Sequence, residues 1–237
     1  MSGESDKRKA SIVQRIIRHG KKGIKGAKAK QFEALVGTYL ANVPQTDLES
    51  YGAANLSRLI VGHLCFAERR KSNAALVRVF NPTEKDHGYR PGHTVVEIAH
   101  ANMPFLVDSV VAEVNRHGLT AHLIIHPIIK TIRDKSGKLT GLLGPGRSDS
   151  GAVAESFMHI ELTELAESRH AGLRKNIERV LGDVRAAVQD WRAMLEQMSD
   201  VIEELVVEPK GANPEDAQEV REFLRWIHDN HFTFLGF

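Results

Sequence analysis

Hydrophobic residues recur along the chain with two periods, one typical of helices and one typical of strands. Over residues 31–43 they fall three and four positions apart, and Pro44 ends the run. A second helical run starts at a cap on Thr46 and continues to Arg70. We therefore predict an N-terminal helical pair within a segment 31–73.

The region after residue 74 alternates between the two periods. A Val-rich run over residues 74–80 closes at Asn81-Pro82 and predicts a strand. Five elements then follow in the order β-α-β-β-α, which is the order of a ferredoxin-like α+β sheet with its helices on one face. The fourth strand of such a sheet could come from residues 74–80 or from beyond the last helix. The five elements are strand 94–100, helix 104–117, strand 119–132, strand 156–164 and helix 170–207.

Two local patterns refine this prediction. Asn102 and Pro104 are typical of a helix cap and a first helical turn, and Gly118 is typical of a helix C-terminus. In the strand 156–164, apolar residues alternate with polar ones, which predicts one wet face and a surface position for His159.

The predicted helix 170–207 has the clearest periodicity in the chain. Its apolar residues are spaced alternately four and three positions apart, which is the a/d pattern of four heptads. Such a seam needs a cover, either a second chain or another element of the same chain, and the pattern leaves both open. The seam comprises Ile177, Leu181, Val184, Val188, Trp191, Leu195, Met198, Ile202 and Leu205.

The last thirty residues predict a linker, a helix and the start of a strand. Pro209 and Gly211 mark the linker, and Asn213 with Pro214 begins the helix. The apolar run 231–237 reads as the opening of a strand, so segment 208–237 is predicted to lead into a following, truncated domain. The predicted organisation is a flexible basic arm 1–30, a helical segment 31–73, the α+β domain 74–207 with its long helix, and segment 208–237.

Charge is distributed unevenly along the 237 residues. The net charge is +2, but the first thirty residues hold ten Lys/Arg and two acidic residues, so the remainder carries a net −6. A basic tail of this kind can bind nucleic acid or anionic lipid. Interleaved glycines and the lack of aromatic residues favour a mobile, solubilising arm with at most a short helix around residues 12–17.

Other features point to a soluble protein of a reducing compartment. The single cysteine, Cys65, excludes an internal disulfide and lies among apolar neighbours, which predicts a buried and inert thiol. No stretch reaches the ~20 apolar residues of a membrane span, and the basic start lacks the apolar run of a secretory signal. We therefore predict a cytoplasmic location.

The sequence carries none of the motifs expected of an enzyme that binds nucleotides or metals. Neither the glycine-rich stretch 141–146 nor the stretch 20–26 has the spacing of a dinucleotide or phosphate loop. His122 and His126 would lie ~13 Å apart along a strand, too far to share an ion. The carboxylate of Asp108 is expected in the first turn of a helix, where the helix dipole favours a negative charge, and needs no catalytic role. We therefore predict no catalytic residue and no metal ligand.

Several blocks of this sequence resemble known families. The stretch from Ala101 to Leu123 looks like an ACT domain, with Phe105 where that family usually places glycine. Four blocks, Met103–Ser109, His126–Ile129, Asp183–Met194 and Glu222–Phe237, are similar to the N-terminal region of the large bacterial NAD-specific glutamate dehydrogenases.

The resemblance implies a non-catalytic regulatory or oligomerisation segment of an enzyme of amino-acid catabolism. The parent reaction converts L-glutamate, NAD and water to 2-oxoglutarate, ammonia and NADH, so we expect no cofactor in this segment and NAD in the parent enzyme. The implied partners are the downstream domains of the same polypeptide, further copies in a homo-oligomer and an amino-acid effector, with neither membrane nor nucleic acid. The alternative is a stand-alone ACT-like amino-acid-sensing module. The candidate effector-binding residues are Asn102, Met103, Pro104, Phe105, Leu106 and Asp108, and the candidate oligomer seam is Val184, Val188, Trp191, Leu195 and Met198.

Overall fold

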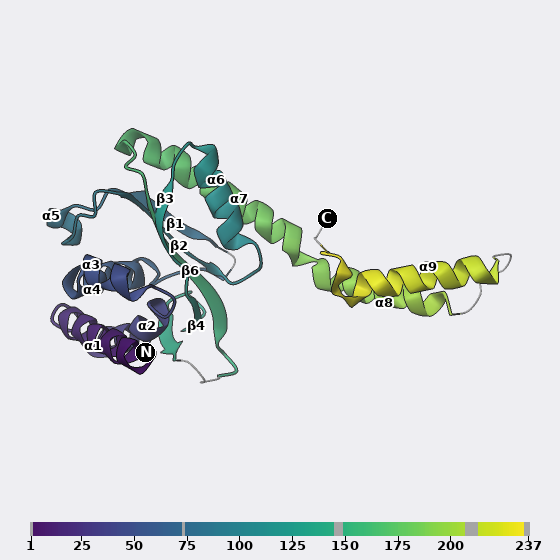
Figure 1. Ribbon diagram of the computed structural model, residues 1–237, viewed down its shortest axis with the longest axis horizontal. Coiled ribbons are helices and arrows are strands. Elements are labelled where there is room, and N and C mark those ends of the chain that lie inside the picture. The colour runs from purple at the N-terminus through teal and green to yellow at the C-terminus, as the bar shows by residue number, and fades with distance from the viewer. Residues whose placement is uncertain (1, 73, 145–148, 207–212, 235–237) are drawn as a thin grey trace. The chain divides into compact units, whose positions relative to one another are not determined.

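The computed structural model describes residues 2–72, 74–144, 149–206 and 213–234. The chain divides into two compact units, Met1–Leu181 and Gly182–Phe237. The first unit contains an antiparallel sheet between two layers of helices, and the second is helical in its described part (Figure 1).

Within the described residues, six strands form the sheet of the first unit. Their order is β1-β2-β6-β4-β5, and β3 pairs with β6 next to β4. All pairings are antiparallel. Strand β1, which precedes the β-α-β-β-α series, is therefore the fourth strand of the ferredoxin-like sheet and pairs with β2. The strands are β1 (Leu76–Phe80), β2 (Thr94–Ala101), β3 (Ala121–Ile125), β4 (Ile128–Arg133), β5 (Leu139–Leu143) and β6 (Val153–Leu162).

The single strand predicted over residues 119–132 is divided into β3 and β4. Pro127 lies between them and has no backbone N–H to donate to the ladder. Its carbonyl still accepts a bond of 3.1 Å from the Phe157 backbone N–H, so both halves stay against β6. The predicted glycine-rich loop after residue 140 begins instead with strand β5, which pairs with β4 across the turn 134–137.

One face of the sheet is covered by the two helices of the predicted unit, α6 (Leu106–Arg116) and α7 (His170–Gln189) (Figure 1). On this face Val96 pairs with Ile160 and Ile98 pairs with Met158. These four side chains are fully buried. The prediction of an α+β sheet in β-α-β-β-α order is confirmed. The helical side chains that complete this layer include Val110, Val114, Leu173, Ile177 and Leu181, each no more than 1% exposed.

The other face is covered by the N-terminal helices, which the sequence pattern predicts only as a separate helical segment. Phe157 and Ala99 on the strands belong to the same buried cluster as Phe32, Leu35 and Tyr39 on the helices. Most of this face is therefore covered as well. The helices are α1 (Ser2–Gly20), α2 (Gly26–Tyr39), α3 (Gln45–Tyr51) and α4 (Ala53–Phe66).

Residues 1–30 differ from the flexible arm that their composition predicts. Helix α1 and the start of α2 occupy this segment, and Ile12, Ile16 and Ile17 are buried. Gly20 lies against the ring of Phe32, with no room for a side chain. Three isoleucines at helical spacing form a narrow apolar stripe, which the many lysines around it obscure in the composition.

The second unit begins within the helix predicted over residues 170–207. This helix is two helices, because Asp190 leaves the helical conformation (φ −105°, ψ 1°) between α7 and α8 (Trp191–Glu204). Helix α9 (Pro214–Trp226) starts as predicted, with the Asn213 side chain accepting a bond from the Glu215 N–H. The expected linker residues Pro209 and Gly211 and the last residues of the expected strand 231–237 lie outside the described residues. Short helices complete the list: α5 (Glu84–His87), η1 (Glu167–Arg169) and η2 (Ile227–His231).

Candidate functional site

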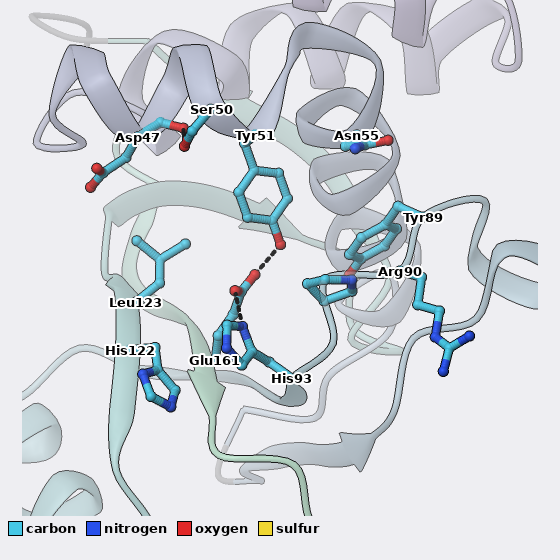
Figure 2. Close-up of a pocket in the computed structure, with 11 residues that line it drawn as sticks. Asp47, Ser50, Tyr51, Asn55, Tyr89, Arg90, His93, His122, Leu123 and Glu161 are labelled. Atoms are coloured by element: carbon cyan, nitrogen blue, oxygen red, sulfur yellow. Dashed lines mark hydrogen bonds and ion pairs between the residues drawn. The ribbon is translucent and has the colours of Figure 1, made fainter.

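A pocket of about 410 Å³ lies between the helices α3 and α4 and the sheet (Figure 2). Helix residues form one wall, the loop before β2 forms a second, and strands β3 and β6 form the floor. Its lining contains charged and aromatic side chains. The lining residues are Asp47, Ser50, Tyr51, Asn55, Tyr89, Arg90, Pro91, His93, His122, Leu123 and Glu161.

The carboxylate of Glu161 is the centre of the pocket floor. It accepts a hydrogen bond from the Tyr51 hydroxyl, and His93 Nδ1 lies 3.2 Å from its other oxygen (Figure 2). The Glu161 side chain is only 4% exposed. Burial raises its pKa, but the bonds from His159, Tyr51 and His93 outweigh this and lower the pKa below the ordinary value. The carboxylate is therefore held ionised by three donors from different parts of the chain.

His159 lies behind Glu161 and joins it to a second buried carboxylate. Its Nε2 is 3.4 Å from Glu161 and its Nδ1 is 3.3 Å from Glu97. Since both ring nitrogens face carboxylates, both are donors and the ring is an imidazolium. Burial lowers the pKa of His159, but the two carboxylates raise it above its usual value. The surface position predicted for His159 is wrong, because the N-terminal helices cover this face and leave the side chain 0% exposed.

Glu97 continues the row of charges to the edge of the sheet. Arg78 on β1 donates to it through Nε at 2.7 Å. Burial raises the pKa of Glu97, yet His63, His159 and Arg78 lower it to about 2. The row Arg78, Glu97, His159, Glu161 therefore alternates in charge, which compensates for the desolvation of each member.

His63 on α4 sits close to this row; it is neutral near pH 7 and becomes charged only at the acidic pH at which Glu97 titrates. Its Nε2 is 3.1 Å from the carbonyl oxygen of Ile98, which can only accept, so Nε2 carries the proton. Nδ1 therefore accepts from the Tyr39 hydroxyl at 2.6 Å. Burial lowers the pKa of His63 to about 4. These two bonds fasten α2 and α4 to strand β2.

The rim of the pocket is polar and aromatic. The rings of His93 and His122 stack with centroids 4.6 Å apart. Asp47 from α3 and Arg90 from the loop before β2 place opposite charges at the two sides (Figure 2). The pKa of the Tyr51 hydroxyl is raised by burial and by Glu161, so neither Tyr51 nor Glu161 exchanges a proton near neutral pH. The arrangement suits binding of a small polar molecule better than proton transfer.

The candidate effector-binding residues lie at the start of α6, away from this pocket. The Asn102 backbone N–H donates to the Ala154 carbonyl at 3.0 Å and continues the strand pairing, so the predicted cap at Asn102 is wrong. The helix begins at Leu106, and Phe105 is its N-cap, 45% exposed and in the left-handed region at φ 67°. Glycine adopts this conformation freely and phenylalanine rarely does. Asn102, Pro104 and Asp108 are exposed, Met103 is half-buried and Leu106 is buried.

The candidate seam residues are divided by the break at Asp190. Val184 and Val188, at the end of α7, are 7% and 8% exposed. Trp191, Leu195 and Met198, on α8, are half-buried. The seam therefore changes helix within the second unit.

The remaining side chains considered for chemistry are dispersed. His126 bonds to the Ser156 hydroxyl at 2.6 Å, and His100 Nδ1 lies 2.7 Å from the Ala101 carbonyl oxygen. Among the described residues, no group of three or more His, Cys, Asp or Glu side chains is placed to hold a metal ion. Cys65 is exposed, contrary to the prediction of a buried thiol, with the Lys28 ammonium 3.6 Å from its sulfur. In the described part of the chain, no helix combines the length and apolarity that crossing a bilayer requires.

The sequence reading missed the pocket because its residues come from five separate segments. One available signal was the polar half of β6, where His159 and Glu161 stand between fully apolar neighbours. Such alternation shows only that the two faces of the strand differ in polarity. The pattern is the same whether the polar face is covered by helices or exposed to water.

An antiparallel sheet of this order, with two helices of its own on one face, defines the class of ACT-like α+β domains. A family model described as the glutamate dehydrogenase ACT1 domain matches residues 35–177, and the chain belongs to this family. The match includes α3 and α4, which form a wall of the pocket.

Three relatives share this similarity, each described as an NAD-specific glutamate dehydrogenase. The chain is 34% identical to the one from Halomonas elongata over 89% of its own length and 13% of the relative's. It is 37% identical to the Pseudomonas aeruginosa protein over 72% of its own length and 11% of the relative's. It is 27% identical to the Mycobacterium tuberculosis protein over 76% of its own length and 11% of the relative's. The chain thus spans only a small part of the length of these relatives.

Proposed function

We propose that this chain is a non-catalytic regulatory and oligomerisation segment of a large NAD-dependent glutamate dehydrogenase, and that it acts by binding an effector in the pocket around Glu161. The parent enzyme would convert L-glutamate, NAD and water to 2-oxoglutarate, ammonia and NADH in the cytoplasm. The family membership supports the parent enzyme, and the charged pocket is the observation that carries the regulatory role.

An effector of the amino-acid class fits the distribution of charge in the pocket. An ammonium group would find the carboxylates of Glu161 and Asp47, and a carboxylate group would find Arg90 and the histidine pair. The walls belong to α3, the loop before β2 and the sheet. Ligand contacts to all three would tie the helical layer to the sheet, which is a means of transmitting binding to the rest of the molecule.

The same lining does not suit NAD. Its pyrophosphate would meet Glu161 and Asp47, whereas such groups are normally bound by backbone N–H groups at a helix N-terminus. We therefore place NAD binding in other parts of the parent enzyme.

The assembly role is supported by exposed apolar side chains in the second unit. Phe223 and Trp226 on α9 stack with ring centroids 6.3 Å apart and are 58% and 49% exposed. Clustered exposed aromatic residues are typical of contact surfaces. We propose that they contact downstream domains of the same polypeptide or a second copy of the chain.

Enzyme assays test the non-catalytic role. The chain alone should form no NADH from glutamate and NAD, whereas the polypeptide that continues through the downstream domains should. NADH formation by the 237 residues alone would refute the proposal.

Calorimetry with a panel of amino acids tests the effector site. We expect one or more amino acids to bind, and Arg90→Ala to weaken that binding at least tenfold while Arg169→Ala, an exposed arginine outside the pocket, leaves it unchanged. Asp108→Asn tests the candidate residues at the start of α6. A loss of binding in this variant and not in Arg90→Ala would contradict the assignment of the effector to the pocket around Glu161. No heat with any amino acid, from protein shown to be folded by circular dichroism, would refute amino-acid binding, including that of the stand-alone sensing module.

A further inference from the structure

A second pocket, also of about 410 Å³, lies at the other end of the sheet and has a different character. The segment after α4, the turn between β4 and β5, and the first residues of β6 surround it. It shares no residue with the pocket around Glu161. Its lining residues are Arg70, Lys71, Ser72, Ala101, Thr131, Arg133, Asp134, Lys135, Ser136, Gly137, Gly151, Val153 and Glu155.

Two arginines share one carboxylate in its wall. Arg133 binds Glu155 through Nε at 2.6 Å and through Nη2 at 2.8 Å, and Arg70 binds it through Nη2 at 2.8 Å. The side chains of Arg70, Arg133 and Glu155 are 3%, 10% and 1% exposed. Three charges are therefore buried together, and one positive charge among them is not neutralised.

The surrounding residues add to this excess of positive charge. Lys71 and Lys135 contribute two cations, against the single carboxylate of Asp134. That carboxylate already accepts bonds from the backbone N–H groups of Ser136 and Lys138 in the turn. The lining as a whole carries four cationic and two anionic side chains, and in a partly desolvated pocket a net charge of +2 attracts an anion.

The guanidinium of Arg70 is held in position by the chain around it. Its Nη1 bonds to the carbonyl oxygens of Lys71, Ser72 and Ala74, at 2.9–3.2 Å. Its Nε is buried and has no hydrogen-bond partner among the described residues. This N–H is enclosed by protein atoms, so Arg70 contributes its positive charge to the pocket rather than a free donor.

The turn between β4 and β5 holds the pocket together from the other side. Gly137, at φ 81°, lies so close to the backbone of Arg70 that a side chain there would collide with it. Its carbonyl oxygen accepts from Arg133 Nη1 at 3.0 Å and from the Arg70 backbone N–H at 2.9 Å. Both arginines are thus fixed before any ligand arrives, which reduces the entropy cost of binding.

We propose that this pocket binds a small metabolite that carries a dianionic oxyanion group, either a phosphate or a pair of carboxylates. Guanidinium groups match both chemistries, and the volume leaves room for more than the anionic group alone. The two lysines supply contacts to it, and the buried arginines add positive charge while Glu155 keeps them in place. This proposal does not depend on the effector pocket around Glu161.

Thermal unfolding and calorimetry with simple anions test the proposal on the intact chain. Inorganic phosphate and succinate are the probes, with acetate and chloride at matched ionic strength as monoanion controls. We expect at least one dianion to raise the unfolding midpoint and bind measurably, while the monoanions do neither. A response to phosphate identifies a phosphorylated ligand, and a response to succinate identifies a dicarboxylate.

Two pairs of variants locate the binding. Lys71→Ala/Lys135→Ala should weaken dianion binding about tenfold, whereas Lys22→Ala/Lys175→Ala, which removes the same charge from exposed positions elsewhere, should not. The proposal is overturned if the folded chain binds neither dianion, or if the two double variants bind equally well.

Discussion

Glu97 shows how one buried carboxylate organises its surroundings. It lies between Arg78 and His159, and its side chain is 1% exposed. Removing one member of a buried charge network leaves the others without compensation, and this is more costly than the network itself is stabilising. The identity of this single residue therefore matters to the stability of the whole sheet.

We expect Glu97→Gln to lower the free energy of unfolding by about 3 kcal/mol at pH 7. The pKa of Glu97 is lowered from 4.5 to about 2, so its contribution is complete above pH 4.5 and is lost as the pH falls toward 2. The variant should therefore lose less stability than the wild type over that interval. Urea denaturation at several pH values measures both effects. An exposed control, Glu164→Gln, should change the free energy by less than about 0.5 kcal/mol.

Phe105 is a residue in a conformation that suits glycine. Its left-handed backbone costs about 1 kcal/mol for a residue with a side chain. We expect Phe105→Gly to raise the free energy of unfolding by about that amount, as measured by urea denaturation. Phe232→Gly, at an exposed phenylalanine with an extended backbone (φ −135°), should give no gain. A loss of stability in Phe105→Gly would show that the ring is held by contacts worth more than the strain.

At the scale of elements, the heptad seam crosses a break between two helices. Its residues continue from α7 into α8, although Asp190 interrupts the helix between them. An apolar seam that crosses a break can pack against another part of its own chain or against a second copy. The half-buried state of Trp191, Leu195 and Met198 leaves apolar surface for a partner.

We expect Val188→Asp/Leu195→Asp to convert an oligomer to a monomer while helix content is retained, since charges in a seam oppose pairing. Light scattering measures the mass and circular dichroism the helix content. Gln189→Asp/Gln197→Asp places the same charges on exposed positions of the same helices and should not change the mass. If the seam variant is folded and its mass equals that of the wild type, the seam packs within the chain.

At the scale of the whole molecule, the division into two units predicts independent stability. A chain of residues 1–189 retains the sheet and both helical layers, so its thermal midpoint should lie within about 2 °C of that of the sheet unit in the full chain.

A chain that lacks residues 1–43 should lose cooperative unfolding, because it lacks the fully buried Phe32, Val36 and Leu40 of the helical layer that covers the sheet. Calorimetry of both chains checks this, and cooperative unfolding of the second would contradict the role of the N-terminal layer.

The sequence by itself determined the features that depend on local periodicity. Apolar spacing placed α6, the strands β2 and β6, and the start of α9 at Asn213 and Pro214, because side-chain direction repeats every 3.6 residues in a helix and every two in a strand. The order of these elements was sufficient for the α+β class and for the resemblance to the glutamate dehydrogenase family, which is confirmed.

Only the tertiary structure decided what covers each face. The alternation in β6 predicts that His159 and Glu161 face water, because polar side chains usually do, but the N-terminal helices cover both residues. Tyr51, which donates to Glu161, lies 110 residues from it in the chain. The pockets around Glu161 and Arg70 arise in the same way, from charges that are distant in sequence. A local pattern records the polarity of a side chain and not the identity of its neighbour, because burial of a charge depends on a compensating partner whose position is set by the fold.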